Sequence, residues 1–261
     1  MGVLDEIVAH KREEVAARRV ARPRGALEAA CRDLAPARDF AEALAPGGGR
    51  RVRLIAEVKK ASPSKGVLAA TLDPATQART YAEAGADAVS VLTDARWFKG
   101  SLDDLVAARA AVPVPVLRKD FMVDEYQLWE ARAAGADAAL LIVAALDREA
   151  LRDLHAAAKG IGLHTLVEAH TAAELEDALA LGARVVGVNN RDLQSLQTDL
   201  ATALRLLPLV PPGHVAVAES GIFTRDDVAR MVGAGAHAVL VGEALVRAGD
   251  VAAKVRELTL A

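Results

Sequence analysis

The chain has 261 residues, 52% hydrophobic but only 3% aromatic, so it can build one large core from aliphatic side chains and alanine without disulfides or metals. Its formal net charge of -3 argues against a nucleic-acid-binding protein, which would normally carry an excess of positive charge. The single cysteine, Cys31, excludes an internal disulfide, and no apolar run reaches the ~20 residues that span a bilayer.

The first 50 residues do not share the pattern of the rest of the chain. Apolar residues recur at helical spacing among charged ones at Leu4, Ile7, Val8 and Val15. This spacing predicts an amphipathic helix over residues 4–19, and Ala45-Pro-Gly-Gly-Gly49 predicts a flexible break. We expect residues 1–50 to pack on a domain of residues 51–261, either as a structural cap or as a lid near an active site. The N-terminus has no apolar signal-peptide segment, so we expect a cytoplasmic protein.

The predicted strand 53–58 leads into a run of charges. Because side chains two residues apart on a strand share a face, Glu57 and Lys59 lie on the same side of it, and Ser62 and Lys65 follow in the loop. Charges at the tip of a buried strand are costly to desolvate, which favours a functional reason for them. This stretch therefore predicts an active site at the mouth of a barrel.

A Gly-Ala phrase followed by an apolar run recurs at residues 84–92, 134–142, 181–189 and 234–242. Each occurrence predicts a helix that ends at its glycine and turns at once into a strand. The strands are continuous apolar runs, which are typical of parallel strands buried on both faces. The period of about 50 residues is roughly twice the length of one βα unit, so the phrase marks every second unit.

The intervening units complete the pattern. Strands are predicted at residues 53–58, 87–92, 114–118, 137–143, 162–167, 184–188, 214–218 and 238–241. Helices are predicted at residues 74–84, 102–111, 124–134, 148–159, 172–181, 200–207, 225–233 and 244–258. Helix N-caps are predicted at Asp73, Ser101, Asp147, Thr171 and Thr224. Eight strands that are each followed by a helix predict an α/β fold, a single (β/α)8 TIM barrel that carries the N-terminal helical extension.

In such a barrel, only residues at the carboxyl ends of strands and in the following loops reach the active site. These positions hold Lys119 after the third strand, Glu168 after the fifth, Asn189 and Arg191 after the sixth, Glu219, Ser220 and Gly221 after the seventh, and Gly242 and Glu243 after the eighth. Together with Glu57 and Lys59, Lys119 and Glu168 predict an acid–base set. Burial would lower a lysine pKa there, whereas an adjacent carboxylate would keep the lysine charged. The alternative is that Glu57–Lys59 and Glu168–Lys119 are structural ion pairs.

Glycines follow the last two predicted strands, where a barrel of this kind usually binds phosphate. Gly221 and Gly242 would let backbone N–H groups approach an anion, and a helix N-terminus favours negative charge. The side chain of Glu243 would then have to turn away while its N–H donates. The pattern predicts a phosphorylated small-molecule ligand; the alternative is that these are ordinary βα turns.

Aromatic residues are scarce, yet Trp97 and Phe98 fall together on a predicted loop. Phe98 and Phe121 could clamp a flat apolar ring, or they could belong to the core. The six histidines show no metal-ligand spacing, and neither a GxGxxG nor a P-loop motif is found. The sequence therefore predicts no metal, nucleotide or redox cofactor.

Several of these stretches together resemble the indole-3-glycerol phosphate synthase family, and the resemblance covers nearly the whole chain. The two most specific stretches are Ile55-Ala-Glu-Val-Lys-Lys-Ala-Ser-Pro-Ser-Lys-Gly66 and Leu117-Arg-Lys-Asp-Phe121. Three further stretches share the resemblance: Leu166-Val-Glu-Ala-His170, Gly187-Val-Asn-Asn-Arg191 and Ala218-Glu-Ser-Gly-Ile222. The resemblance implies a cofactor-free carboxy-lyase of tryptophan biosynthesis. Its substrate would be 1-(2-carboxyphenylamino)-1-deoxyribulose 5-phosphate, which closes its second ring with loss of carbon dioxide and water.

The resemblance also implies a role for each candidate residue. Lys119 would donate a proton to the carbonyl oxygen and attract the substrate carboxylate, while Lys59, Glu168 and Glu57 would share the remaining proton transfers in a division that stays open. Asn189 would hold a substrate hydroxyl and Ser220 would line the pocket. The phosphate would be held by Arg191, Gly221, Gly242 and the N–H of Glu243, with Ser62 and Lys65. Phe98 and Phe121 would pack on the anthranilate ring.

Two alternatives remain at the level of the sequence. One is a sister phosphosugar barrel such as an Amadori isomerase, which would lack the long N-terminal extension and carry a carboxylate or cysteine in place of Lys119. The other is a barrel without activity that binds a phosphorylated ligand or a partner subunit. We expect a monomer, or a weak dimer, that binds neither nucleic acid nor membrane.

Overall fold

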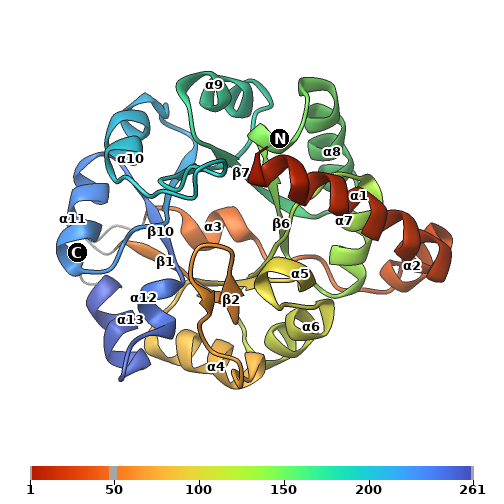
Figure 1. The fold of residues 1–261 in the computed structure, drawn as a ribbon, viewed down its shortest axis with the longest axis horizontal. Coiled ribbons are helices and arrows are strands. Elements are labelled where there is room, and N and C mark those ends of the chain that lie inside the picture. Colours follow the sequence, from red (N-terminus) through yellow and green to blue (C-terminus); the bar gives the residue numbers. More distant parts are fainter. Residues whose placement is uncertain (1, 47–51, 260–261) are drawn as a thin grey trace.

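The computed structural model describes residues 2–46 and 52–259. Within these ranges, eight parallel strands close into a barrel (Figure 1). They are β1 (Arg53–Val58), β4 (Ala88–Leu92), β5 (Val116–Lys119), β6 (Ala138–Ile142), β7 (His164–Ala169), β8 (Val185–Asn189), β9 (Val215–Glu219) and β10 (Ala238–Val241). Pairing of β10 with β1 closes the ring, so the predicted (β/α)8 fold is confirmed. Among the described residues, no helix is long and apolar enough to cross a membrane.

Helices surround the barrel (Figure 1). The outer ring consists of α4 (Pro74–Ala84), α6 (Leu102–Ala111), α7 (Glu125–Ala133), α8 (Arg148–Gly160), α9 (Ala172–Ala180), α10 (Ala201–Leu206), α11 (Arg225–Gly233) and α13 (Val251–Thr259). Short additional pieces are the hairpin β2 (Ala61–Ser62) and β3 (Gly66–Val67), α5 (Ala95–Phe98), η1 (Val143–Ala145), η2 (Leu207–Leu209) and α12 (Glu243–Val246). The predicted N-caps all accept a backbone N–H from the first turn of their helices.

Two local predictions are wrong. The predicted helix 244–258 is interrupted between α12 and α13, where Gly249 precedes a new cap: Asp250 accepts the N–H of Ala253 at 2.9 Å. Trp97 and Phe98 lie on the short helix α5 rather than on a loop, because the carboxylate of Asp94 caps its first turn through the N–H of Trp97 at 2.7 Å. Most strands also begin or end one to three residues away from their predicted limits.

The two faces of each strand serve two separate cores. Outward-facing residues such as Leu54 and Ala56 pack against the helices. The inward-facing core includes Ile55, Leu117, Leu166 and Val217. Two residues further along the same strands, the inward positions are charged: Glu57, Lys119, Glu168 and Glu219. The barrel is thus apolar at its middle and ionic at the carboxyl ends of its strands.

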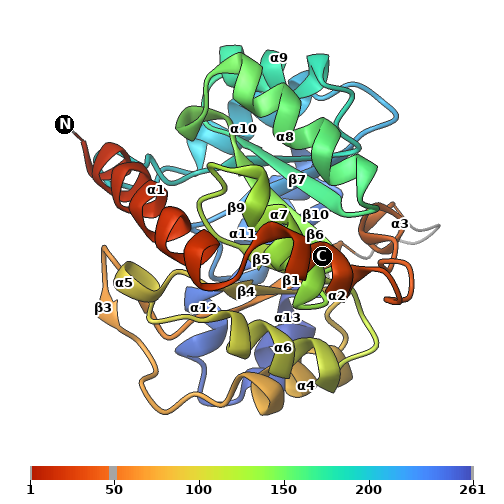
Figure 2. The same ribbon diagram turned by 90° about the vertical axis from the view of Figure 1, so that its right-hand side faces the viewer.

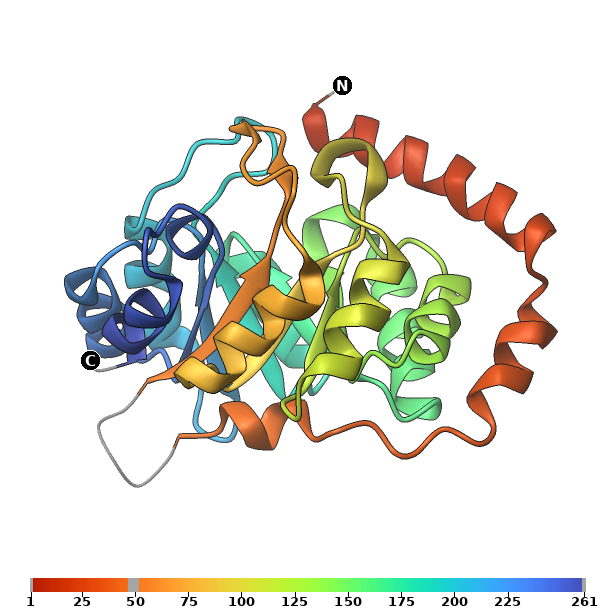
Figure 3. The same cartoon turned by 90° about the horizontal axis from the view of Figure 1, so that it is seen from below.

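The N-terminal segment wraps around the barrel from one end to the other (Figures 2 and 3). Helix α1 (Val3–Ala21) crosses the mouth, α2 (Arg24–Cys31) packs beside α7, and α3 (Phe40–Leu44) closes the opposite end. Phe40 and Leu44 are fully buried in the inward-facing core. The expected boundary near residue 50, and most of the expected break at 45–49, lie outside the described residues.

Candidate active site

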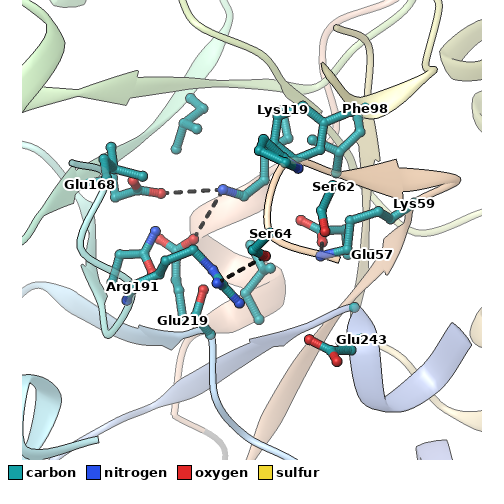
Figure 4. Close-up of a pocket in the computed structure, with 18 of the residues that line it drawn as sticks. Glu57, Lys59, Ser62, Ser64, Phe98, Lys119, Glu168, Arg191, Glu219 and Glu243 are labelled. Carbon is teal, nitrogen blue, oxygen red and sulfur yellow. Dashed lines mark hydrogen bonds and ion pairs between the residues drawn. The ribbon is translucent and has the colours of Figure 1, made fainter. Parts of the chain in front are cut away.

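One cavity opens at the carboxyl ends of the strands (Figure 4), and Leu4 and Ile7 of α1 line part of it. Its walls include most of the residues singled out from the sequence: Glu57, Lys59, Ser62, Phe98, Lys119, Phe121, Glu168, Asn189, Arg191, Ser220, Gly221, Gly242 and Glu243. Lys65 does not line this cavity, because it lies on the exposed turn between β2 and β3. Residues far apart in the sequence therefore meet at one mouth, as parallel strands of one barrel require.

The ammonium of Lys119 lies between two carboxylates at the centre of the cavity (Figure 4). Its Nζ is 3.2 Å from Oε2 of Glu168 and 3.4 Å from Oε2 of Glu219. Both glutamates are 1% exposed, and the lysine side chain is 15% exposed. A buried ammonium beside two carboxyl groups has hydrogens to donate and a strong local field, which suits it to a substrate that carries negative charge.

Burial and charge oppose each other at these three groups. Burial lowers the pKa of Lys119, but the charges of Glu168 and Glu219 outweigh burial and raise it, so the lysine stays protonated. For Glu168, burial raises the pKa, but the Lys119 charge and His170 lower it well below the usual range. Burial and the charge of Glu168 raise the pKa of Glu219 far above that of an ordinary carboxyl. One carboxylate is thus held ionised and the other favours its proton.

A second ion pair lies on the wall formed by β1. Lys59 Nζ is 2.5 Å from Oε1 of Glu57, as their shared face predicted, and both side chains are largely buried. Gly242 faces this pair: a β-carbon there would come within 2.3 Å of Oε1 of Glu57 and 3.0 Å of Nζ of Lys59. Gly242 therefore provides the space in which the pair sits.

The turn after β9 has an unusual backbone. Ser220 and Gly221 both adopt left-handed conformations, with φ of 64° and 75°. A serine in this region carries strain, which is common where a functional loop is held in a fixed shape. Glu243, the first residue of α12, pairs at 3.2 Å with Arg247, which caps the end of the same helix, so its carboxylate has a cationic partner away from the turn after β9.

Arg191 joins two loops across the mouth of the cavity. Its guanidinium donates to Oγ of Ser64 at 3.1 Å (Figure 4) and to the carbonyl of Leu196 at 2.8 Å. The backbone N–H of Arg191 donates to Oδ1 of Asn189 at 3.0 Å. Ser64 belongs to the loop after β1, whereas Leu196 belongs to the loop after β8. The guanidinium is therefore fixed at the rim of the cavity that Ser220 and Gly221 also line.

The apolar wall of the cavity is partly aromatic. The ring centroids of Phe98 and Phe121 lie 6.3 Å apart, and the ring planes are tilted by 39°. The two rings therefore form one surface and do not face each other across a gap that a third ring could enter. Both pack with the inward-facing core and both line the cavity. Leu4 and Ile7 of α1 line the same space, so the extension supplies part of this wall.

A buried ion cluster anchors α1 behind this wall. The ammonium of Lys11 is fully buried and lies 2.8 Å from Glu14, 2.9 Å from Asp94 and 2.9 Å from Asp120. Asp94 caps the helix that carries Phe98, and Asp120 follows Lys119. The cluster therefore connects the extension to the two segments that shape the cavity.

Two parts of the site were missed in the sequence. The sequence places Glu219 at the end of a strand but assigns it no role. Gly187 was an available signal for its position, because a β-carbon at Gly187 would come within 2.1 Å of Oε1 of Glu219. A glycine inside a strand often marks such a close approach. The bond between Ser64 and Arg191 left no signal, because it depends on how two distant loops meet.

The sequence model of the family "Indole-3-glycerol phosphate synthase" matches residues 4–258. A protein of that name from Nocardioides sp. is 56% identical, over 99% of this chain and 98% of its own length. Another of the same name, from Roseiflexus castenholzii, is 53% identical, over 98% and 97%. Among solved structures, a thiamine phosphate pyrophosphorylase from Pyrococcus furiosus superposes with a TM-score of 0.59 at 17% identity, over 79% of this chain and 93% of that one, a likeness of fold alone. By the extent of these matches, the chain belongs to the indole-3-glycerol phosphate synthase family.

Proposed function

We propose that the chain is an indole-3-glycerol phosphate synthase of tryptophan biosynthesis. It converts 1-(2-carboxyphenylamino)-1-deoxyribulose 5-phosphate into indole-3-glycerol phosphate, carbon dioxide and water. The observation that carries this proposal is the ammonium of Lys119, which is held between Glu168 and Glu219 in the same cavity as an aromatic wall and a glycine-bearing rim. We also propose that this enzyme is cytoplasmic and acts on this small molecule as a monomer, without a cofactor.

The substrate has three features that the cavity can recognise. Its phosphate fits the rim, where the guanidinium of Arg191 and the backbone of Gly221 and Gly242 lie. Its benzene ring fits the surface formed by Phe98 and Phe121. Its carboxylate and ketone oxygen carry or develop negative charge, and both would be drawn to an ammonium between those two ends.

Ring closure joins the carbon that bears the carboxylate to the ketone carbon. Electrons move onto the ketone oxygen, which takes a proton, and Lys119 is the acid we assign to that step because its neighbours keep it protonated. Carbon dioxide then leaves, and its bonding electrons restore the aromatic ring. This return of aromaticity drives the step without an external electron sink.

Dehydration completes the indole. The hydroxyl formed from the ketone needs an acid in order to leave as water, and the ring nitrogen or its neighbouring carbon must give up a proton to a base. Lys59, Glu57 and Glu168 divide these two roles. Lys59 carries an ammonium beside Glu57, and Glu168 is held as a carboxylate, so the set contains a donor and an acceptor at neutral pH.

The direct test is turnover by the purified full chain, followed by the fluorescence of the indole product. We expect the unmodified protein to turn over the substrate, and Lys119→Met to lower kcat by about 10²- to 10⁴-fold, the usual contribution of a general acid. The matched control is Lys60→Met, since Lys60 pairs with Asp104 on α6 at 2.7 Å and does not line the cavity. A lack of turnover by the unmodified protein would contradict the proposed activity, and full turnover by Lys119→Met would contradict the role of Lys119.

A further inference from the structure

His170 lies beside the carboxylate of Glu168 and contacts the oxygen that Lys119 does not. Oε2 of Glu168 is the atom near Lys119, whereas Oε1 is 3.4 Å from Nε2 of His170. This second contact is an ion pair without the alignment of a hydrogen bond. The imidazole side chain is 12% exposed, so it is held at the edge of the site and away from bulk water.

The first turn of α9 fixes the position of this ring. Thr171 caps the helix, and Glu174 three residues later turns back toward the cap. Oε2 of Glu174 accepts the backbone N–H of His170 at 2.8 Å and lies 3.2 Å from the ring Nδ1, while Oε1 accepts from the hydroxyl of Thr171 at 3.1 Å. The imidazole is therefore placed between two carboxylates, one on each side.

These carboxylates keep the imidazole charged. Burial lowers the pKa of His170, but Glu168 on β7 and Glu174 on α9 outweigh burial and raise it to about 10. Asp192, in the loop after β8, also interacts with the ring, and its charge likewise favours the cation. At neutral pH both ring nitrogens then carry protons.

The two carboxylates that approach Lys119 are similar in distance and burial. They come from β7 and β9, lie within 0.2 Å of the same distance from Nζ, and are equally buried. Two carboxylates that share one ammonium hold one negative charge too many for a buried site. Among the described residues, the carboxylate oxygens of Glu219 have no hydrogen-bond partner, whereas Glu168 has a second cation beside it.

We infer that His170 is a positioning residue that makes Glu168 and Glu219 differ in charge. Its imidazolium holds Glu168 as the ionised carboxylate, so the one proton that the two carboxyl groups hold between them stays on Glu219. The inference rests on the proposed function and deepens it: His170 decides which carboxylate is free to accept a proton during the reaction. It touches no reacting atom and acts only through Glu168.

The kinetic test is the pH profile of His170→Gln, which removes the charge but keeps a polar side chain. Loss of the neighbouring cation raises the pKa of Glu168 toward the ordinary carboxyl range, so the acid limb of kcat/KM is expected to move up into the measurable pH range. At the acid end of that range kcat/KM of the variant should fall about tenfold or more relative to the unmodified enzyme, in which Glu168 stays ionised. Near pH 8 the variant is expected to approach the rate of the unmodified enzyme. An acid limb at its original pH would overturn the inference.

Two matched variants separate charge from scaffolding. Glu174→Gln loosens the first turn of α9 but leaves His170 protonated at low pH, so its acid limb is expected to stay near that of the unmodified enzyme. An acid limb that moves as far as in His170→Gln would indicate a structural role and overturn the inference. His155→Gln removes another half-buried imidazole, which contacts Thr165 at 3.1 Å and does not line the cavity, and should leave the profile unchanged.

A measurement without substrate keeps this inference separate from the proposed activity. The ring carbons of isotopically labelled histidine can be titrated by NMR in the unmodified protein, with His170 assigned from the signal that His170→Gln lacks. We expect an imidazolium that persists above about pH 8, whereas an ordinary histidine loses its proton near pH 6.5. Titration near that ordinary value would overturn the inference even if the enzyme turns over its substrate. A persistent imidazolium would support it even if this substrate is not the right one.

Discussion

Removal of the Lys11 ammonium should cost more stability than removal of any surface lysine. The change is Lys11→Met, which keeps the length of the side chain. It leaves Asp94 and Asp120, 0% and 2% exposed, without the cation that lies 2.9 Å from each. Breaking a buried pair in this way costs about 3–5 kcal/mol. Asp120 keeps Arg118 at 3.0 Å, so we place the loss in the lower half of that range.

The assay is thermal unfolding followed by circular dichroism. At about 2–4 °C per kcal/mol for a protein of this size, the variant should melt roughly 6–16 °C below the unmodified protein. Lys254→Met is the control, because its pair with Glu257 at 2.6 Å is on the surface of α13 and should contribute about 0–1 kcal/mol. A loss no larger in Lys11→Met than in the control would refute the reasoning.

The pH dependence of this loss has a definite sign. Burial raises the pKa of Asp120, but Arg118 and Lys11 outweigh burial and lower it to about 2. A depressed pKa stabilises the fold above the unfolded value near 3.9, and this contribution disappears as the pH falls toward 2. The difference in melting temperature between Lys11→Met and the unmodified protein should therefore shrink as the pH is lowered through this window.

Three further changes have expected outcomes. Gly242→Ala places a β-carbon 2.3 Å from the carboxylate of Glu57 and should lower kcat at least tenfold. In the control Gly233→Ala the added β-carbon meets no atom within 4 Å, so kcat should not change. Steady-state kinetics of both variants distinguish a local effect at the site from general damage. Phe98→Ala removes part of the ring-binding surface and should raise KM about tenfold with little change in kcat; an unchanged KM would place the substrate ring elsewhere. Burial and the charge of Glu168 raise the pKa of Glu219, so this carboxyl makes the unmodified fold lose stability as the pH rises from about 4.5 toward 8. Glu219→Gln should therefore gain stability relative to the unmodified protein over that window, and thermal melts at both ends of the window would reveal the difference.

The fold and much of the site could be predicted because they depend on local periodicity. Continuous apolar strands and helix-ending glycines indicate parallel βα units, and closure of such units brings the strand ends together. The alternation of side chains along a strand then places Glu57, Lys119 and Glu168 on the inner face. These inferences need only the spacing of residues within one unit.

The remainder depends on contacts between distant segments. Lys11 occupies a position in the apolar stripe of α1 next to Leu4, Ile7 and Val15, and a lysine in such a stripe was an available signal for a buried ion pair. Its partners could not be identified, because they depend on the path of α1 across the mouth. The role of Glu219 was missed for a similar reason, since its interaction with Lys119 spans the full width of the barrel interior.

A crystal structure with indole-3-glycerol phosphate bound tests the central claim most directly. We predict that the phosphate lies at the rim beside Arg191 and Gly221, that the indole packs on Phe98, and that Nζ of Lys119 faces the atoms between them. Product bound at any other surface, or an indole whose reacted carbons lie beyond hydrogen-bond reach of every ammonium in the cavity, would contradict the account.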